Sequence, residues 1–80
     1  MNISENDLKK ILSKSLNVKI NKITENLNSN SLEEWDSLGQ LSIISSLDKK
    51  FKGKVNFSKL STLHTYRDIK NFLKKKSLMK

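Results

Sequence analysis

The side chains best suited to chemistry are an adjacent acid and hydroxyl, Asp36 and Ser37, in the stretch EWDSLGQL. An apolar run at helical spacing follows them, so Ser37 falls at the capping position or the first position of a helix. The free N–H groups and the dipole of a helix N-terminus stabilise a negatively charged group such as a phosphate. Because Asp36 can supply the cap equally well, Ser37 is either a plain N-cap or an exposed, firmly held hydroxyl in a field that suits a phosphodiester.

The other reactive side chains do not form a catalytic or metal-binding set. The chain has no cysteine and one histidine, His64, which excludes disulfides, thiolate metal sites and histidine clusters. The adjacent carboxylates Glu33 and Glu34 point to different sides of the chain and indicate a solvated loop rather than an acid–base pair. With two glycines there is no Gly-rich phosphate loop. We therefore expect a protein that is not an enzyme and binds no metal.

The net charge of +8 is compatible with a nucleic-acid or anionic-surface partner. The lysines are spread along the chain, however, and Arg67 is the sole arginine. Guanidinium groups dominate the bidentate recognition of phosphates and bases, so we expect no nucleic-acid partner. No apolar run approaches membrane-spanning length and no signal segment begins the chain. We expect a cytoplasmic monomer without stable membrane insertion.

Eighty residues make one domain, residues 1–80, with a modest core. Its first helix is predicted over about 5–16, because Ser4 and Asp7 form a capping-box pattern and an apolar stripe follows them. The second helix is predicted over about 37–51. Its expected core stripe comprises Leu38, Leu41, Ile44, Leu47 and Phe51, with Ile43 beside it.

A third helix is predicted over about 65–74, beginning at a second capping-box pattern formed by Thr65 and Asp68. A single helical turn is expected near 58–62, and the tail after Lys74 is expected to fray. The connection between the first two helices is rich in Asn and Ser and is expected to be a long loop. Its expected anchors on the bundle are apolar: Val18, Ile20, Ile23, Leu27, Leu32 and Trp35. The predicted fold is a small all-α bundle of three to four helices with a long anchored loop between the first and second helices.

The arrangement of Trp35-Asp36-Ser37-Leu38, the apolar helix after it and the long loop before it resembles the acyl carrier proteins. The stretches KSLNVKINKITENLNSNSLEEWDSL and HTYRDIKNFL resemble the family's loop, motif and last helix, so the resemblance covers most of the chain. A bare Asp-Ser-Leu tripeptide occurs by chance, and the spacing and helix pattern give the motif its weight.

The resemblance implies that Ser37 carries 4′-phosphopantetheine. Asp36 is then the motif acid, which helps a phosphopantetheinyl transferase, the holo-carrier synthase, to hold Mg²⁺ and orient the serine, and Leu38 is a packing member of the motif. The implied function is carriage of acyl groups as thioesters, which acyl-loading and acyl-using enzymes supply and consume. The absence of cysteine fits this function, because the cofactor brings its own thiol.

The chain departs from the common members of the family, which present acids on the second helix. The residues expected to face partner enzymes are Glu34, Trp35, Gln40, Ser42 and Ser45, although packing over the bundle end is the favoured alternative for Trp35. Charge complementarity governs encounter and partner choice, so this surface indicates a specialised pathway rather than bulk fatty-acid synthesis. Two alternatives remain: an aminoacyl or peptidyl carrier, as in nonribosomal synthesis or alanylation of cell-wall polymers, and a basic helical module that binds nucleic acid or an anionic surface.

Overall fold

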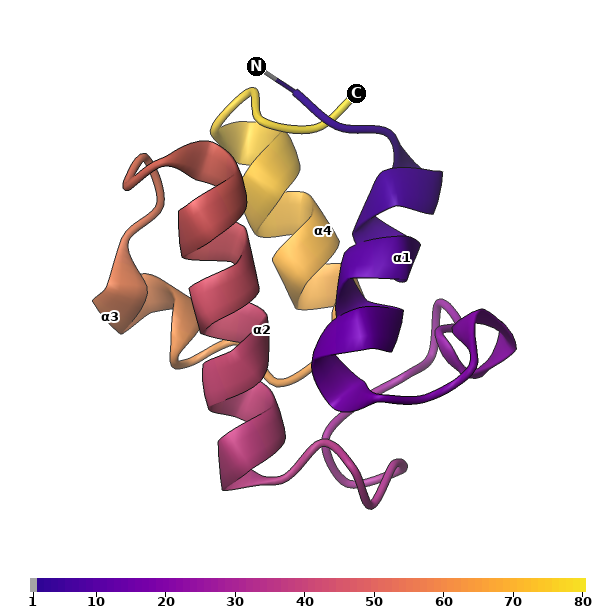
Figure 1. Ribbon diagram of the computed structural model, residues 1–80. Coiled ribbons are helices and arrows are strands. Elements are labelled where there is room, and N and C mark those ends of the chain that lie inside the picture. The colour runs from indigo at the N-terminus through magenta and orange to yellow at the C-terminus, as the bar shows by residue number, and fades with distance from the viewer. Residues whose placement is uncertain (1) are drawn as a thin grey trace.

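The computed structural model describes residues 2–80, and its elements are all helical (Figure 1). The elements are α1 (Glu5–Leu16), the 3-10 helix η1 (Ile20–Lys22), α2 (Ser37–Phe51), α3 (Phe57–Leu60) and α4 (Tyr66–Lys75). Over these residues the backbone forms no strand, only two isolated bridges. The predicted all-α class is therefore confirmed.

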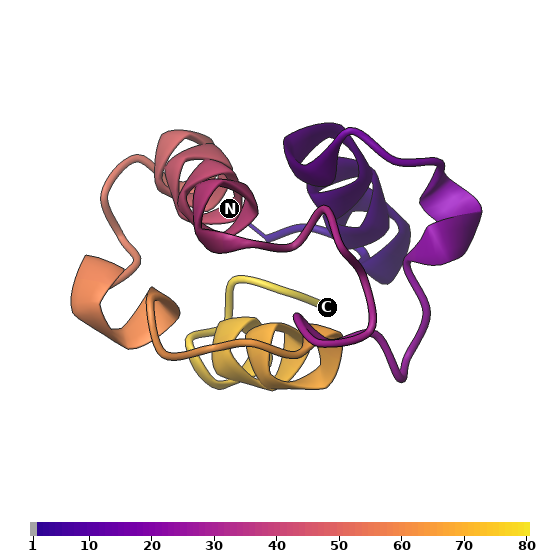
Figure 2. The same cartoon turned by 90° about the horizontal axis from the view of Figure 1, so that it is seen from below.

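The helices lie in two layers around one core. In Figure 2, α1 and α2 lie side by side, α4 lies on the opposite side of the core, and the short α3 lies at the edge next to α2. The core is formed by aliphatic and aromatic side chains of all four α-helices, by loop residues and by both ends of the described chain. Its helical members are Leu8, Leu12, Leu16, Ile43, Ile44, Leu47, Phe51, Leu60, Tyr66, Ile69, Phe72 and Leu73.

Local hydrogen bonds fix where α1 and α4 begin. At α1 the Asp7 N–H donates to the Ser4 hydroxyl and the Ser4 N–H donates to the Asp7 carboxylate, each over 3.1 Å, which is the predicted capping box. At α4 the Asp68 N–H donates to the Thr65 hydroxyl over 3.0 Å. Both helices therefore begin with a hydroxyl side chain that satisfies an N–H group of the first turn.

The core-facing side of α2 differs from the predicted stripe. Leu38 is 74% exposed and Leu41 is 50% exposed, whereas Gly39 is buried and Ile43 is 1% exposed. The helix is rotated so that Gly39, Ile43, Ile44 and Leu47 face the core, which turns Leu38 outward. The assignment of Leu38 and Leu41 to the core stripe is therefore wrong.

The segment between α1 and α2 packs against the helices through some of the apolar side chains that were expected to anchor it. Ile23, Leu27 and Trp35 are buried, and Val18 and Leu32 pack partly buried against the core. Ile20 lies in η1 and is 40% exposed, so it is not an anchor. The Tyr66 N–H donates to the Leu27 carbonyl over 2.9 Å, which ties this segment to the start of α4.

The C-terminal tail is packed rather than frayed. Leu78 and Met79 are buried, and the Ile3 N–H donates to the Leu78 carbonyl over 3.0 Å. The Lys80 N–H donates in turn to the Ile3 carbonyl over 2.9 Å. The prediction of a fraying tail is wrong. The tail is held by hydrogen bonds to Ile3, which is far away in the sequence but lies beside the tail in the fold (Figure 1).

A polar cluster joins α1, the loop and α4. The Lys70 ammonium lies 3.4 Å from the Glu5 carboxylate and 2.5 Å from that of Glu25. The Tyr66 hydroxyl donates to Glu5 over 3.0 Å. Burial and this hydrogen bond raise the pKa of Tyr66 well above its ordinary value. The cluster therefore holds the start of α1 against α4.

Candidate functional site

Asp36, not Ser37, caps α2. Its carboxylate accepts a hydrogen bond from the Gly39 N–H over 2.9 Å, and its carbonyl accepts one from the Gln40 N–H over 2.8 Å. Ser37 is the first helical residue and is exposed. Within residues 2–80 its hydroxyl has no hydrogen-bond partner. The interpretation of Ser37 as a plain N-cap is therefore wrong, and its oxygen is left free at the helix N-terminus.

Close packing at Gly39 fixes the position of this helix N-terminus. A Cβ atom at residue 39 would overlap the Glu34 carbonyl oxygen and would lie 2.8 Å from Cδ2 of Leu16. Only glycine lets the backbone of α2 approach the loop and α1 this closely. Ser37, two residues earlier, is therefore held on a rigid backbone although its own side chain is free.

Gln40 and Trp35 are structural rather than partner-facing. The Trp35 indole N–H donates to the Gln40 side-chain oxygen over 2.6 Å. The Gln40 amide donates to the carbonyls of Leu60 and Leu63 over 3.0 and 2.9 Å. Trp35 is 2% exposed, which bears out the packing alternative. The expectation that these two residues face partners is wrong, because their polar groups satisfy one another and the α3–α4 connection.

The remaining candidate site residues lie on the surface. Glu34, Ser42 and Ser45 are exposed, as is Leu38, for which the expected packing role is therefore wrong. The Leu38 side chain, 74% exposed, is therefore uncovered beside the exposed Ser37.

An open hollow of about 460 Å³ lies beside Ser37. It runs from the start of α2 to the chain between α3 and α4. Its lining residues are Ser29, Asn30, Trp35, Asp36, Ser37, Gln40, Leu41, Ser61 and His64. Residues with hydroxyl, amide and imidazole groups thus line the hollow together with Ser37, and none of its lining residues is a lysine or an arginine. A phosphate ester on Ser37 has room here, next to first-turn N–H groups of α2.

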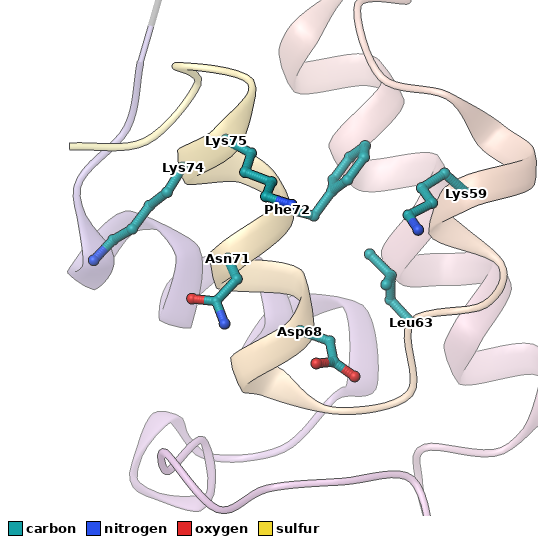
Figure 3. A pocket seen from close by; sticks show the side chains of 7 residues that line it. All are labelled: Lys59, Leu63, Asp68, Asn71, Phe72, Lys74 and Lys75. Atoms are coloured by element: carbon teal, nitrogen blue, oxygen red, sulfur yellow. The ribbon is translucent and has the colours of Figure 1, made fainter.

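A second hollow, of about 610 Å³, lies between α3 and α4 and shares no residue with the first. In Figure 3 the side chains of Leu63 and Phe72 point toward its middle, Lys59 reaches in from α3, and Lys74 points away. Leu63 and Phe72 are each only 8% exposed. The full lining is Lys59, Leu63, Asp68, Asn71, Phe72, Lys74 and Lys75. This hollow therefore does not extend the surroundings of Ser37.

No helix within residues 2–80 combines the length and the apolar character that crossing a membrane requires. In the same residues no three His, Cys, Asp or Glu side chains converge as metal ligands.

No model of a protein family, no curated protein and no solved structure matches the chain. A functional assignment therefore depends on the residues themselves.

Proposed function

We propose that the chain is an acyl carrier protein that bears acyl groups as thioesters on a 4′-phosphopantetheine arm attached to Ser37. The proposal rests on one observation: the fold uses Asp36 for the cap and leaves the Ser37 hydroxyl exposed and unbonded within residues 2–80. A tether needs an oxygen that a transferase reaches and that the fold does not need. Ser37 meets both requirements.

Each neighbour of Ser37 has a part in this proposal. Asp36 fixes the first turn of α2 and, as the motif acid, helps the transferase to hold Mg²⁺ and orient the serine. On attachment, phosphorus would exchange its bond to the nucleotide part of coenzyme A for a bond to Ser37 Oγ, and the Oγ proton would leave with the released nucleotide part. The N-terminus of α2 favours the negative charge of the resulting phosphodiester.

When attached, the arm supplies the thiol on which acyl groups travel, and the chain has no cysteine that would compete with it. The exposed Leu38 beside Ser37 gives partner enzymes an apolar contact next to the arm. The arrangement suits a protein that presents cargo and leaves the chemistry to its partners.

The proposal is tested by incubating the unmodified protein with coenzyme A, Mg²⁺ and a broad-range phosphopantetheinyl transferase. Intact mass spectrometry should show a gain of one 4′-phosphopantetheine per chain. Ser37→Ala should show no gain. Ser42→Ala and Ser45→Ala are matched controls, because these serines are exposed on the same helix, and both variants should be modified fully. A wild-type chain that stays unmodified contradicts the proposal, and so does a modified Ser37→Ala variant.

The cargo separates the acyl carrier from the aminoacyl or peptidyl carrier, since both share the same attachment. The intact mass of the protein isolated from its own cells, before and after thioester cleavage with hydroxylamine, gives the mass of the group released. An aliphatic acyl mass supports the proposal, whereas an amino-acid or peptide mass assigns the alternative.

A further inference from the structure

A groove lies between α1 and the C-terminal half of α2, and its lining is both apolar and basic. It consists of two adjoining hollows of about 440 and 320 Å³, and we refer to it as the α1–α2 groove. Four lysines and one carboxylate line it. Its lining residues are Asp7, Lys10, Ile11, Ser13, Lys14, Ile20, Ser46, Lys49 and Lys50.

The single carboxylate of the groove is already engaged. Asp7 accepts the Ser4 N–H and bonds the Ser4 hydroxyl through its own N–H, so its side chain belongs to the capping box of α1. The pKa of Asp7 is lowered mainly by these bonds to Ser4, and additionally by the charges of Lys10 and Lys50. The groove therefore presents a clear excess of positive charge to any molecule that enters it.

Apolar side chains are exposed along the same face. Four large hydrophobic residues are exposed within residues 2–80, and three of them lie here. Ile20 lines the groove itself. Leu38 and Leu41 line a further hollow that shares Lys14 and Ser46 with the groove and extends toward the start of α2. Ile11 forms a partly buried floor. The face thus combines uncovered apolar side chains with a lysine rim.

We propose that the α1–α2 groove docks an acidic segment of a partner protein that also carries apolar side chains. Carboxylates of the segment pair with Lys10, Lys14, Lys49 and Lys50, and an apolar side chain packs on Ile11 and Ile20. Opposite charges across such a surface accelerate encounter and select the partner, while buried apolar groups at the centre hold it.

Charge and shape favour a protein segment over other anionic partners. The chain's one arginine, Arg67, lies on α4 and not in the groove, whereas recognition of phosphates favours guanidinium groups. A membrane surface requires a wide apolar face on one helix, and here Ser13, Ser46 and the lysines divide the exposed apolar side chains. A segment with alternating acidic and apolar groups matches this mixed lining.

The hollow in Figure 3 provides the contrast. Three lysines and Asp68 line it, and its apolar members Leu63 and Phe72 are already buried. The lysines are Lys59, Lys74 and Lys75. Lys76 additionally lies over the Phe72 ring, 5.9 Å from its centroid. This hollow therefore offers positive charge without an uncovered apolar surface, which makes it a control site.

The test uses the full, unmodified chain, so its outcome does not depend on whether Ser37 accepts a prosthetic group. A fluorescently labelled peptide with glutamates and leucines at helical spacing is titrated at low salt. Matched probes are the same peptide with glutamine in place of glutamate, a single-stranded oligonucleotide and phosphatidylglycerol vesicles. The acidic peptide should bind and should shift the amide NMR signals of Ile11, Lys14 and Lys50. It should bind more tightly than each of the other probes.

Charge reversal then locates the binding. Lys14→Glu with Lys50→Glu should weaken peptide binding by about tenfold or more, because attraction becomes repulsion. Lys59→Glu with Lys75→Glu changes the net charge equally and should alter binding by less than about twofold. Circular dichroism checks that both variants fold. No binding of the acidic peptide, equal binding of the glutamine peptide, equal loss in the two double variants, or preference for the oligonucleotide or vesicles would each overturn the proposal.

Discussion

The N-termini of α1 and α2 each have a serine near the helix start, but the fold uses only one of the two hydroxyls. At α1, Ser4 is the N-cap, and its hydroxyl and N–H both bond to Asp7. At α2, Asp36 is the N-cap and Ser37 follows it with a free side chain. A shift of one residue between hydroxyl and cap thus separates a structural serine from one that is available for modification.

The start of α2 is also held more firmly than its exposed serine suggests. Gly39 presses on the Glu34 carbonyl and on Leu16, and the Gln40 side chain bonds to Trp35 and to two carbonyls. The start of α1 is held instead by the hydrogen bonds of its capping side chains and by the hydrogen bond from the Tyr66 hydroxyl to Glu5. The start of α2 is therefore held in place by residues beside Ser37 and not by Ser37 itself. We expect substitutions of those neighbours, and of the capping residues at α1, to destabilise the two helix starts.

Among single substitutions near the start of α2, we expect the greatest loss of stability at Gln40. Gln40→Leu removes the partner of the Trp35 indole N–H and of the Leu63 carbonyl in a part-buried site. The Leu60 carbonyl also loses a bond but keeps the one from the Leu63 N–H. An unsatisfied buried polar group costs about 1–3 kcal/mol, so the free energy of unfolding should fall by about 2–4 kcal/mol in urea titrations. Ser42→Ala on the exposed face of α2 should change it by less than about 0.5 kcal/mol. A tolerated Gln40→Leu variant would show that α2 does not depend on this network.

Removing the two serine hydroxyls and the Asp36 cap one at a time should change the free energy of unfolding less than Gln40→Leu does. Ser4→Ala and Asp36→Ala each remove a cap and should each lower the free energy of unfolding by about 0.5–2 kcal/mol. Ser37→Ala removes a hydroxyl without a partner in the described residues and should change it by less than about 0.5 kcal/mol. Equal losses at Ser4 and Ser37 would show that the two serines have the same structural role.

The pH dependence of stability changes least, through the Asp7 carboxylate at the start of α1. The hydrogen bonds to Ser4, with a further contribution from nearby lysines, hold the pKa of Asp7 below its ordinary value of 3.8. A carboxylate with a lowered folded-state pKa stabilises the fold fully above its unfolded-state pKa and loses that contribution as the pH falls through the folded-state pKa. Urea midpoints should therefore fall less steeply below about pH 4 in Asp7→Asn than in wild type. Ser37→Ala should keep the wild-type slope, and parallel curves for wild type and Asp7→Asn would remove Asp7 from this account.

Sequence patterns predicted the local features of the fold well. The capping box of Ser4 and Asp7 and the apolar stripe after it gave α1 its observed bounds, because both signals lie within one helix. The Asp36-Ser37 pair likewise marked the start of α2 at Ser37. Which of the two residues caps the helix stayed open, because either side chain satisfies a first-turn N–H group.

The errors came from contacts between distant segments. Leu38 and Leu41 fit a helical stripe, but the approach of Glu34 and Leu16 selects Gly39 for the buried side and turns the leucines outward. A glycine in the first turn of a helix, unfavourable by about 1 kcal/mol relative to alanine, was the signal for this contact. The sequence alone directs Gln40 toward partner enzymes, because the carbonyls of Leu60 and Leu63 that its side chain binds are positioned by tertiary packing.

If the Ser37 oxygen is the tether, the modified serine is present in the protein isolated from its own cells, where mass spectrometry detects it without an added transferase. Fragmentation of the proteolytic peptide that contains Ser37 should show 4′-phosphopantetheine on this serine, with or without cargo. The peptide that contains Ser4 should carry no such group. An unmodified Ser37 in cells that also contain an active phosphopantetheinyl transferase would contradict the account.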